Sequence, residues 1–261
     1  MKRILLIILC FIVVITTVKA QKSTKIDSLI LKGKEMINEA VNSWNPDKMR
    51  QTRAYFERLL SDTTYPWLVH YYIGFTDMRL YHHSLSEDDK EKAILFIDNG
   101  IEHLEKAIEI KDDFGEGYAL LSSLLGNKIG LNPMLGMTLG MKSGRMISRA
   151  FQLAPENPRV SLIAGQSHYY TPKMFGGGKE KAMEMVDKAI EFYQRFTPHS
   201  PLYPTWGNDE AYAYKGMIYT DWEQWEEAKK SFEKGLEINP NNNWIRMSLI
   251  PAMEEKMNAD Q

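Results

Sequence analysis

Apolar residues recur at three- and four-residue steps along most of the chain, and this spacing constrains the fold more than any other feature. Between 228 and 238, Ala228, Phe232 and Leu236 share one helical face, while lysines and glutamates occupy the opposite face. Pro240 then ends the pattern, because a proline cannot continue a helix. No useful length of chain alternates apolar and polar residues as a half-buried strand would. The sequence therefore predicts an all-α protein.

A long helical chain is best searched for internal repeats. The segment 209–241 predicts a helix pair with small residues where the helices cross, aromatic residues between them and a proline after the second helix. The residues in these positions are Tyr212, Gly216, Tyr219, Ala228, Phe232, Gly235 and Pro240. With this spacing the segment resembles the tetratricopeptide (TPR) repeat. Looser versions of the pattern occur at 159–194, 115–155 and 66–111, and 26–60 reads as one further helical pair. In 209–241, Lys215 departs from the usual leucine of the repeat.

This resemblance implies a right-handed solenoid of four or five helix pairs. Each pair has an apolar face that it cannot hide alone, so neighbouring pairs stack and share a core. Two insertions lengthen the pattern, one near 84–92 and a larger one at Gly126–Gly144. A final helix around 244–256 is expected to cap the stack, kinked or split by Pro251.

Residues 1–20 read as a secretory signal. A basic start at 1–3 precedes fifteen mostly apolar residues, Ile4–Val18, and Val18-Lys19-Ala20 offers small residues for cleavage. A membrane-spanning helix would need roughly 18 to 20 apolar residues. Cys10, the only cysteine, follows Leu9 inside the apolar run, which argues against a lipoprotein. We expect an exported protein of the periplasm or cell envelope, with a single TPR-like domain at 21–261.

The charge balance argues against two classes of partner. Removal of residues 1–20 takes away Lys2, Arg3 and Lys19 and no acid, which leaves 29 basic against 34 acidic residues. No run of basic residues stands out. Nucleic acid and anionic membrane surfaces are therefore poor partners, and any membrane association is expected to be indirect.

The TPR resemblance implies that a ligand lies on the concave surface, which the first helix of each pair lines. Aromatic residues and arginine commonly anchor interfaces, so we expect a protein or peptide partner, although each tyrosine could instead pack between helices. A grip on a terminal carboxylate is not supported, because Tyr71 and Phe75 stand where polar residues would be needed. The predicted groove positions are Tyr71, Phe75, Arg79, Asn127, Arg159, Gln166, Tyr170, Tyr214 and Asp221.

The Gly126–Gly144 insertion alternates methionines with leucines. Methionine suits adaptable contact surfaces, so the insertion reads either as a lid or patch for a small apolar ligand, or as a loop packed on the solenoid. The stretch 171–178 is similar to exported bacterial TPR proteins, including the TPR component of some periplasmic solute-transport systems. An accessory role in solute or lipid binding is therefore the alternative function.

No catalytic motif emerges. The glycines at 176–178 lack the spacing of a nucleotide-binding P-loop, and there is no HExxH, nucleophile elbow or zinc-spaced cysteine set. The pair His82-His83 reads as part of a surface loop. We expect a non-catalytic TPR protein without a cofactor or metal, which binds another protein or a peptide through its concave groove.

Overall fold

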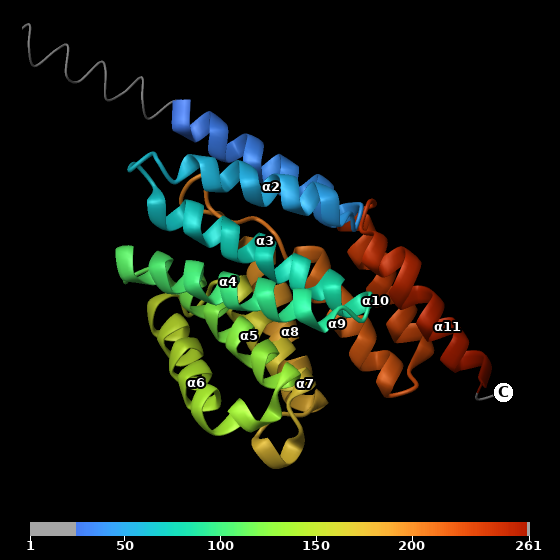
Figure 1. Cartoon of the computed structure of the whole chain (residues 1–261). Coiled ribbons are helices and arrows are strands. Elements are labelled where there is room, and N and C mark those ends of the chain that lie inside the picture. Colours follow the sequence, from blue (N-terminus) through green and yellow to red (C-terminus); the bar gives the residue numbers. More distant parts are fainter. Residues whose placement is uncertain (1–24, 260–261) are drawn as a thin grey trace, which may run out of the picture.

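The computed structural model describes residues 25–259, and the predicted signal segment lies outside them. This part of the chain is helical and contains no strand (Figure 1). Successive helices pack as pairs, so the predicted all-α helical solenoid is confirmed. The pairs are a helix at 25–42 with α2 (Pro46–Leu59), α3 (Pro66–Ser86) with α4 (Lys90–Ile110), α5 (Gly115–Leu131) with α6 (Gly136–Leu153), α7 (Pro158–Tyr170) with α8 (Lys179–Arg195), and α9 (Asn208–Asp221) with α10 (Trp225–Ile238).

Small residues sit where the two helices of a pair cross. A Cβ atom added to Gly216 of α9 would lie 2.4 Å from the ring of Phe232 on α10. A Cβ atom added to Gly74 of α3 would likewise lie 2.7 Å from the Leu104 side chain on α4. A larger side chain at either glycine would force the helices apart, which explains the small residues of the repeat.

Local signals set several helix starts. Prolines occupy the first turn of α2, α3 and α7, where a missing backbone N–H costs no helical hydrogen bond. The side chains of Asn45, Asp89 and Asn157 accept backbone N–H groups at the starts of α2, α4 and α7. Such caps satisfy donors that the helix itself leaves free.

Both predicted insertions extend the helices that flank them. α3 and α4 extend to within three residues of each other, which places His82 and His83 on α3 and not in a loop. The Gly126–Gly144 stretch continues α5, turns through the short η1 (Pro133–Leu135) and begins α6. Leu139 packs against the core, whereas Met137 is exposed. Gly126–Gly144 is thus neither a lid nor a loop but the tip of a helical hairpin.

The C-terminal cap has the break that Pro251 predicts. A π-helical turn, η3 (Ile245–Leu249), precedes α11 (Ile250–Ala259), and Pro251 is the second residue of α11. Proline offers no N–H to the preceding turn, and the wider hydrogen bonding of a π turn accommodates that gap. Ile245 and Met253 then bury against Phe232 and close the apolar end of the stack.

Candidate functional site

The chain itself occupies the middle of the concave surface. Residues 196–207, here called the crossover segment, connect α8 to α9 and run beside the first helices of the N-terminal pairs (Figure 1). The Lys34 ammonium group donates to the carbonyls of Pro201 at 2.5 Å and Tyr203 at 2.6 Å. The Tyr72 hydroxyl donates to the carbonyl of Leu202 at 2.5 Å. The crossover segment therefore lies where a TPR ligand would be expected.

Trp206 anchors this segment. Its ring centroid lies 4.9 Å from that of Phe75, and its indole N–H donates to the Tyr71 hydroxyl at 3.0 Å. The Arg79 guanidinium lies 5.7 Å from the same indole ring, within cation–π range. Packing, a hydrogen bond and a cation together hold Trp206 against α3.

Two buried ion pairs flank the crossover segment. Arg159 of α7 donates to Glu116 of α5 at 2.7 Å, and both side chains are almost fully buried. Arg79 of α3 forms a second pair with Glu210 of α9. Burial, reinforced by the nearby positive charge of Arg159, lowers the pKa of Lys34 to about 8. Each arginine is thus paired with a glutamate, whereas the Lys34 ammonium group is held by backbone carbonyls of the crossover segment.

Four predicted groove residues are consequently not available to a ligand. Tyr71, Phe75, Arg79 and Arg159 are buried, with at most 8% of each residue exposed. A fifth predicted residue, Tyr214, is also only 8% exposed, and its ring contacts Tyr169 and Tyr170. The helices of the first four do face the concave side, but the crossover segment covers that side. The prediction of an open groove at these four positions was wrong, because a connection from a distant repeat fills it.

The remaining predicted residues lie on the C-terminal parts of α5 and α7 and on α9, from Tyr214 in its middle to Asp221 at its end. Tyr170 is 64% exposed, and its ring contacts Tyr214 at 6.3 Å and Tyr169 at 4.9 Å between centroids. Tyr81 of α3 joins this group, since its hydroxyl donates to the Asn127 carbonyl at 3.4 Å. We call Tyr81, Asn127, Tyr169, Tyr170 and Tyr214 the tyrosine cluster. Gln166, one turn before Tyr170 on α7, is half-buried.

Charged groups border the tyrosine cluster. Tyr169 donates to the Asp221 carboxylate at 2.7 Å, and Lys179 and Lys256 approach it at 3.0 and 3.2 Å. Burial opposes ionisation of Asp221, yet these hydrogen bonds lower its pKa. Asp221 is therefore a fixed anion beside the exposed ring of Tyr170.

One further polar group of the tyrosine cluster is the side-chain amide of Asn127. Its side-chain nitrogen is buried without a hydrogen-bond partner among the described residues. An unsatisfied buried donor is uncommon in a folded protein, and a bound acceptor or ordered water would relieve it. The tyrosine cluster thus combines an exposed aromatic ring, a fixed anion and a free donor.

Sequence reasoning missed Tyr81 and Trp206. Tyr81 lies two residues beyond the predicted Arg79, on a part of α3 that reads as the edge of an insertion. The composition of the crossover segment could have pointed to Trp206. Residues 196–207 carry three prolines and two aromatic residues beyond Phe196, and they match no repeat position. A connection rich in proline and aromatic residues is expected to pack against another part of the protein, and here it packs against the groove.

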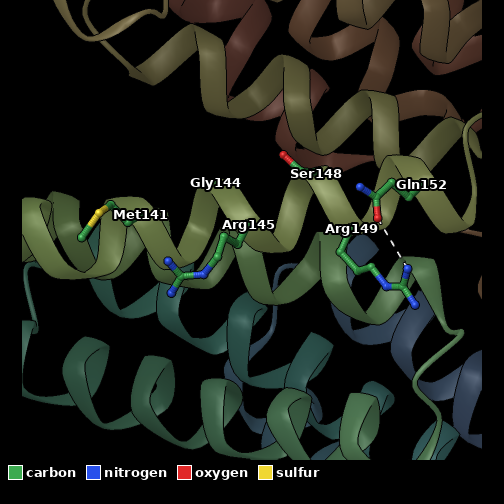
Figure 2. Close-up of a pocket in the computed structure, with 6 residues that line it drawn as sticks. All are labelled: Met141, Gly144, Arg145, Ser148, Arg149 and Gln152. Atoms are coloured by element: carbon green, nitrogen blue, oxygen red, sulfur yellow. Dashed lines mark hydrogen bonds between the residues drawn. The ribbon is translucent and has the colours of Figure 1, made fainter.

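A hollow of about 610 Å³ runs along α6, lined by residues of that helix alone (Figure 2). It is open to solvent, so it is not an enclosed pocket of the kind that a lid at Gly126–Gly144 would form over a small apolar ligand. Its lining mixes apolar, polar and cationic groups: Met141, Gly144, Arg145, Ser148, Arg149 and Gln152.

Metal ligands do not gather anywhere in the described chain. Within residues 25–259, no three histidine, cysteine or acidic side chains are grouped closely enough to hold a metal ion. In the same range no helix has the length and apolar character to cross a membrane.

Comparisons with known proteins identify the repeat and the fold. The tetratricopeptide-repeat family model matches residues 209–242. The HusA haemophore from Porphyromonas gingivalis is 24% identical, with a TM-score of 0.58 over 70% of this chain and 93% of its own. A thermophilic TPR protein from Thermus thermophilus is 14% identical, with a TM-score of 0.57 over 85% and 98% of the two chains. No curated protein matches the sequence. At these identities the likenesses establish the fold.

Proposed function

Residues 209–242 are a tetratricopeptide repeat in a chain with the TPR solenoid fold; from this premise we propose a non-catalytic, exported protein that binds a protein partner through the tyrosine cluster. TPR solenoids serve mainly as scaffolds for protein–protein contacts. The crossover segment moves the free part of the concave surface to the ends of α5, α7 and α9. The proposed partner therefore binds at one end of the groove.

Exposure of Tyr170 is the observation that carries this proposal. A tyrosine that is 64% exposed, yet supported edge-on by Tyr169 and Tyr214, presents a rigid aromatic surface to solvent. Aromatic side chains held in this way lose little entropy on binding and are common interface anchors. Asp221, with Lys179 and Lys256 beside it, adds charged groups that would orient a partner.

Location in the periplasm or cell envelope is part of the same proposal. It rests on the signal-like residues 1–20, which the structure does not describe. Expression of the full chain followed by N-terminal sequencing of the exported product tests it. Cleavage after Ala20 supports export, and retention of Met1 in the cell interior contradicts it.

Affinity capture from envelope extract, with the chain from residue 21 as bait, tests the partner. A Tyr170→Ala bait should retain the partner at least about fivefold less than the unmodified bait, because loss of an anchoring aromatic residue costs more than about 1 kcal/mol. A Tyr65→Ala bait, changed at the residue before α3 and at the end of that helix remote from Tyr81, is the control. Because Tyr65 packs partly against the core, circular dichroism should show that this bait is folded. Equal retention by all three baits would exclude the tyrosine cluster.

Binding of a haem-class ligand is a second candidate function. The HusA haemophore aligns over 93% of its own length, at an identity above that of the Thermus TPR protein. Tyrosine is a known haem iron ligand, and Tyr170, which is 64% exposed, stands among aromatic rings. Titration with haemin should then shift the Soret band, and Tyr170→Phe should remove the shift. An unchanged spectrum at equimolar haemin rules this candidate out.

A further inference from the structure

Two neighbouring connections between helices, the α5–α6 and α7–α8 turns, expose large apolar side chains at one edge of the solenoid. The first helices of successive pairs run in the same direction, so the α5–α6 and α7–α8 turns share an edge, and α5 packs against α7 (Figure 1). Met134 and Met137 at the α5–α6 turn are 90% and 85% exposed. Met174 and Phe175 at the α7–α8 turn are 82% and 73% exposed. The edge therefore carries an exposed apolar patch on two adjacent turns.

Apart from Glu116, which is buried in its ion pair with Arg159, every charged residue of the α5–α6 hairpin is basic. Residues 117–155 contain two lysines, two arginines and no aspartate or glutamate, in a chain whose net charge is −2. Lys128 and Lys142 are neutralised by Asp98 and Glu105 of α4. Arg145 and Arg149 have no carboxylate partner among the residues that the structure describes; Arg149 contacts only the Gln152 amide, at 3.5 Å.

The geometry separates the apolar and cationic groups along one helix. Figure 2 shows Met141, Arg145 and Arg149 along the exposed side of α6. Only Ala150 of this helix is buried, and α6 touches α7 far less than α4 touches α5. The apolar tip at Met134 and Met137 thus leads into an uncovered helix face with two free arginines.

We propose that the α5–α6 hairpin, together with the α7–α8 turn, docks directly on an anionic phospholipid surface. The methionines and Phe175 would enter the boundary between headgroups and acyl chains, and Arg145 and Arg149 would pair with lipid phosphates. Amphipathic helices with a cationic face bind anionic bilayers in this manner. The net charge of −2 for the whole chain does not indicate this cationic face, because the acidic residues lie in other parts of the chain.

The neighbouring turns limit the contact to this patch. The α3–α4 turn carries Glu87, Asp88 and Asp89, and the α9–α10 turn carries Asp221 and Glu223. An anionic surface would repel both outer turns and attract the two middle ones. The proposal does not depend on a partner at the tyrosine cluster, so the two can fail independently.

Vesicle sedimentation tests the proposal. The chain from residue 21, which holds every helix described, avoids a contribution from the apolar residues 4–18. It should sediment with vesicles that contain 30% phosphatidylglycerol and not with pure phosphatidylcholine vesicles. Arg145→Glu/Arg149→Glu should reduce the partition coefficient by at least about 30-fold. Removal of each surface charge contributes roughly a fivefold factor, and reversal of the charge adds to it. Met134→Glu/Met137→Glu should reduce it comparably.

Matched controls come from α10 and η3. Lys229→Glu/Lys230→Glu makes the same charge change on an exposed helix, and Met247→Glu alters another exposed methionine. Neither should change the partition coefficient. All of these side chains are exposed, so unchanged circular dichroism should accompany every variant. Equal sedimentation of the hairpin variants, or of the protein with neutral vesicles, would overturn the proposal. So would a dimer in size-exclusion chromatography that the hairpin variants dissociate, because a second copy would then cover this face.

Discussion

Arg79 on α3 and Glu210 on α9 form a buried ion pair across the inside of the solenoid, although 131 residues separate them in the sequence. The pair ties the second helix pair directly to the fifth. Asn239 at the end of α10 adds a hydrogen bond to Asn42 at 2.9 Å, beside the first pair. Contacts of this range distinguish the molecule from a repeat array in which each pair touches only its neighbours.

Loss of one partner of this ion pair should destabilise the fold strongly. In Glu210→Ala the Arg79 guanidinium stays buried without its counter-charge, which typically costs about 3–5 kcal/mol. The double variant Arg79→Met/Glu210→Leu should recover most of that loss, because apolar replacements remove both desolvated charges. Urea denaturation measures both free energies of unfolding. A double variant as unstable as Glu210→Ala would contradict the assignment.

Trp206 should be essential to the covered groove. In Trp206→Ala the ring contact with Phe75 and the hydrogen bond to Tyr71 are lost, and the free energy of unfolding should fall by about 3 kcal/mol. Trp206→Phe should cost less, since it retains a ring against Phe75. Thermal unfolding followed by circular dichroism ranks the two. If both variants match the unmodified protein, the crossover segment contributes little to stability.

Two helical glycines should respond to alanine in opposite directions. The added methyl group of Gly216→Ala would meet the Phe232 ring, and overpacking of this kind typically costs about 1–3 kcal/mol. Gly126 lies within α5, and no atom stands within 4 Å of the place that a Cβ atom would take, so Gly126→Ala should stabilise the protein by about 0.5–1 kcal/mol. Chemical denaturation measures both. Stabilisation by Gly216→Ala would show that the helix crossing is not tightly packed.

Two histidines should make the protein less stable in mild acid. The Nδ1 atoms of His70 on α3 and His103 on α4 lie 2.8 Å apart. Burial, then the proximity of His70, lowers the pKa of His103 to about 4, whereas an unfolded histidine titrates near 6.5. The unfolded chain therefore binds more protons between these values, so stability falls as the pH drops from about 6.5 to about 4.

A His103→Gln variant isolates this effect. Glutamine keeps a polar group at the site but does not titrate. The loss of Tm between pH 7 and pH 5 should be smaller in the variant than in the unmodified protein, as measured by differential scanning calorimetry. Parallel Tm curves for the two proteins would show that this histidine pair does not control the acid response.

The repeat pattern was readable from the sequence because it is local. Helical periodicity, the proline and asparagine signals at helix ends and the small residues at crossings each act within about forty residues. They predict the helix pairs, the role of Gly216 and the break before Pro251. The structure of Gly126–Gly144 was harder to predict. Its glycines are typical of a loop, whereas the spacing of its leucines and methionines continues two helices.

The positions of the groove residues were predictable, but their exposure was not. Sequence alone determined which faces of α3, α5, α7 and α9 turn toward the concave side, since that follows from helical spacing. Only the tertiary structure decided that Tyr71, Phe75, Arg79 and Arg159 are covered and that Tyr170 is free. The reason is physical: the crossover segment and Glu210 reach these helices through contacts between distant parts of the chain, and no local pattern records which distant segment a surface will bury.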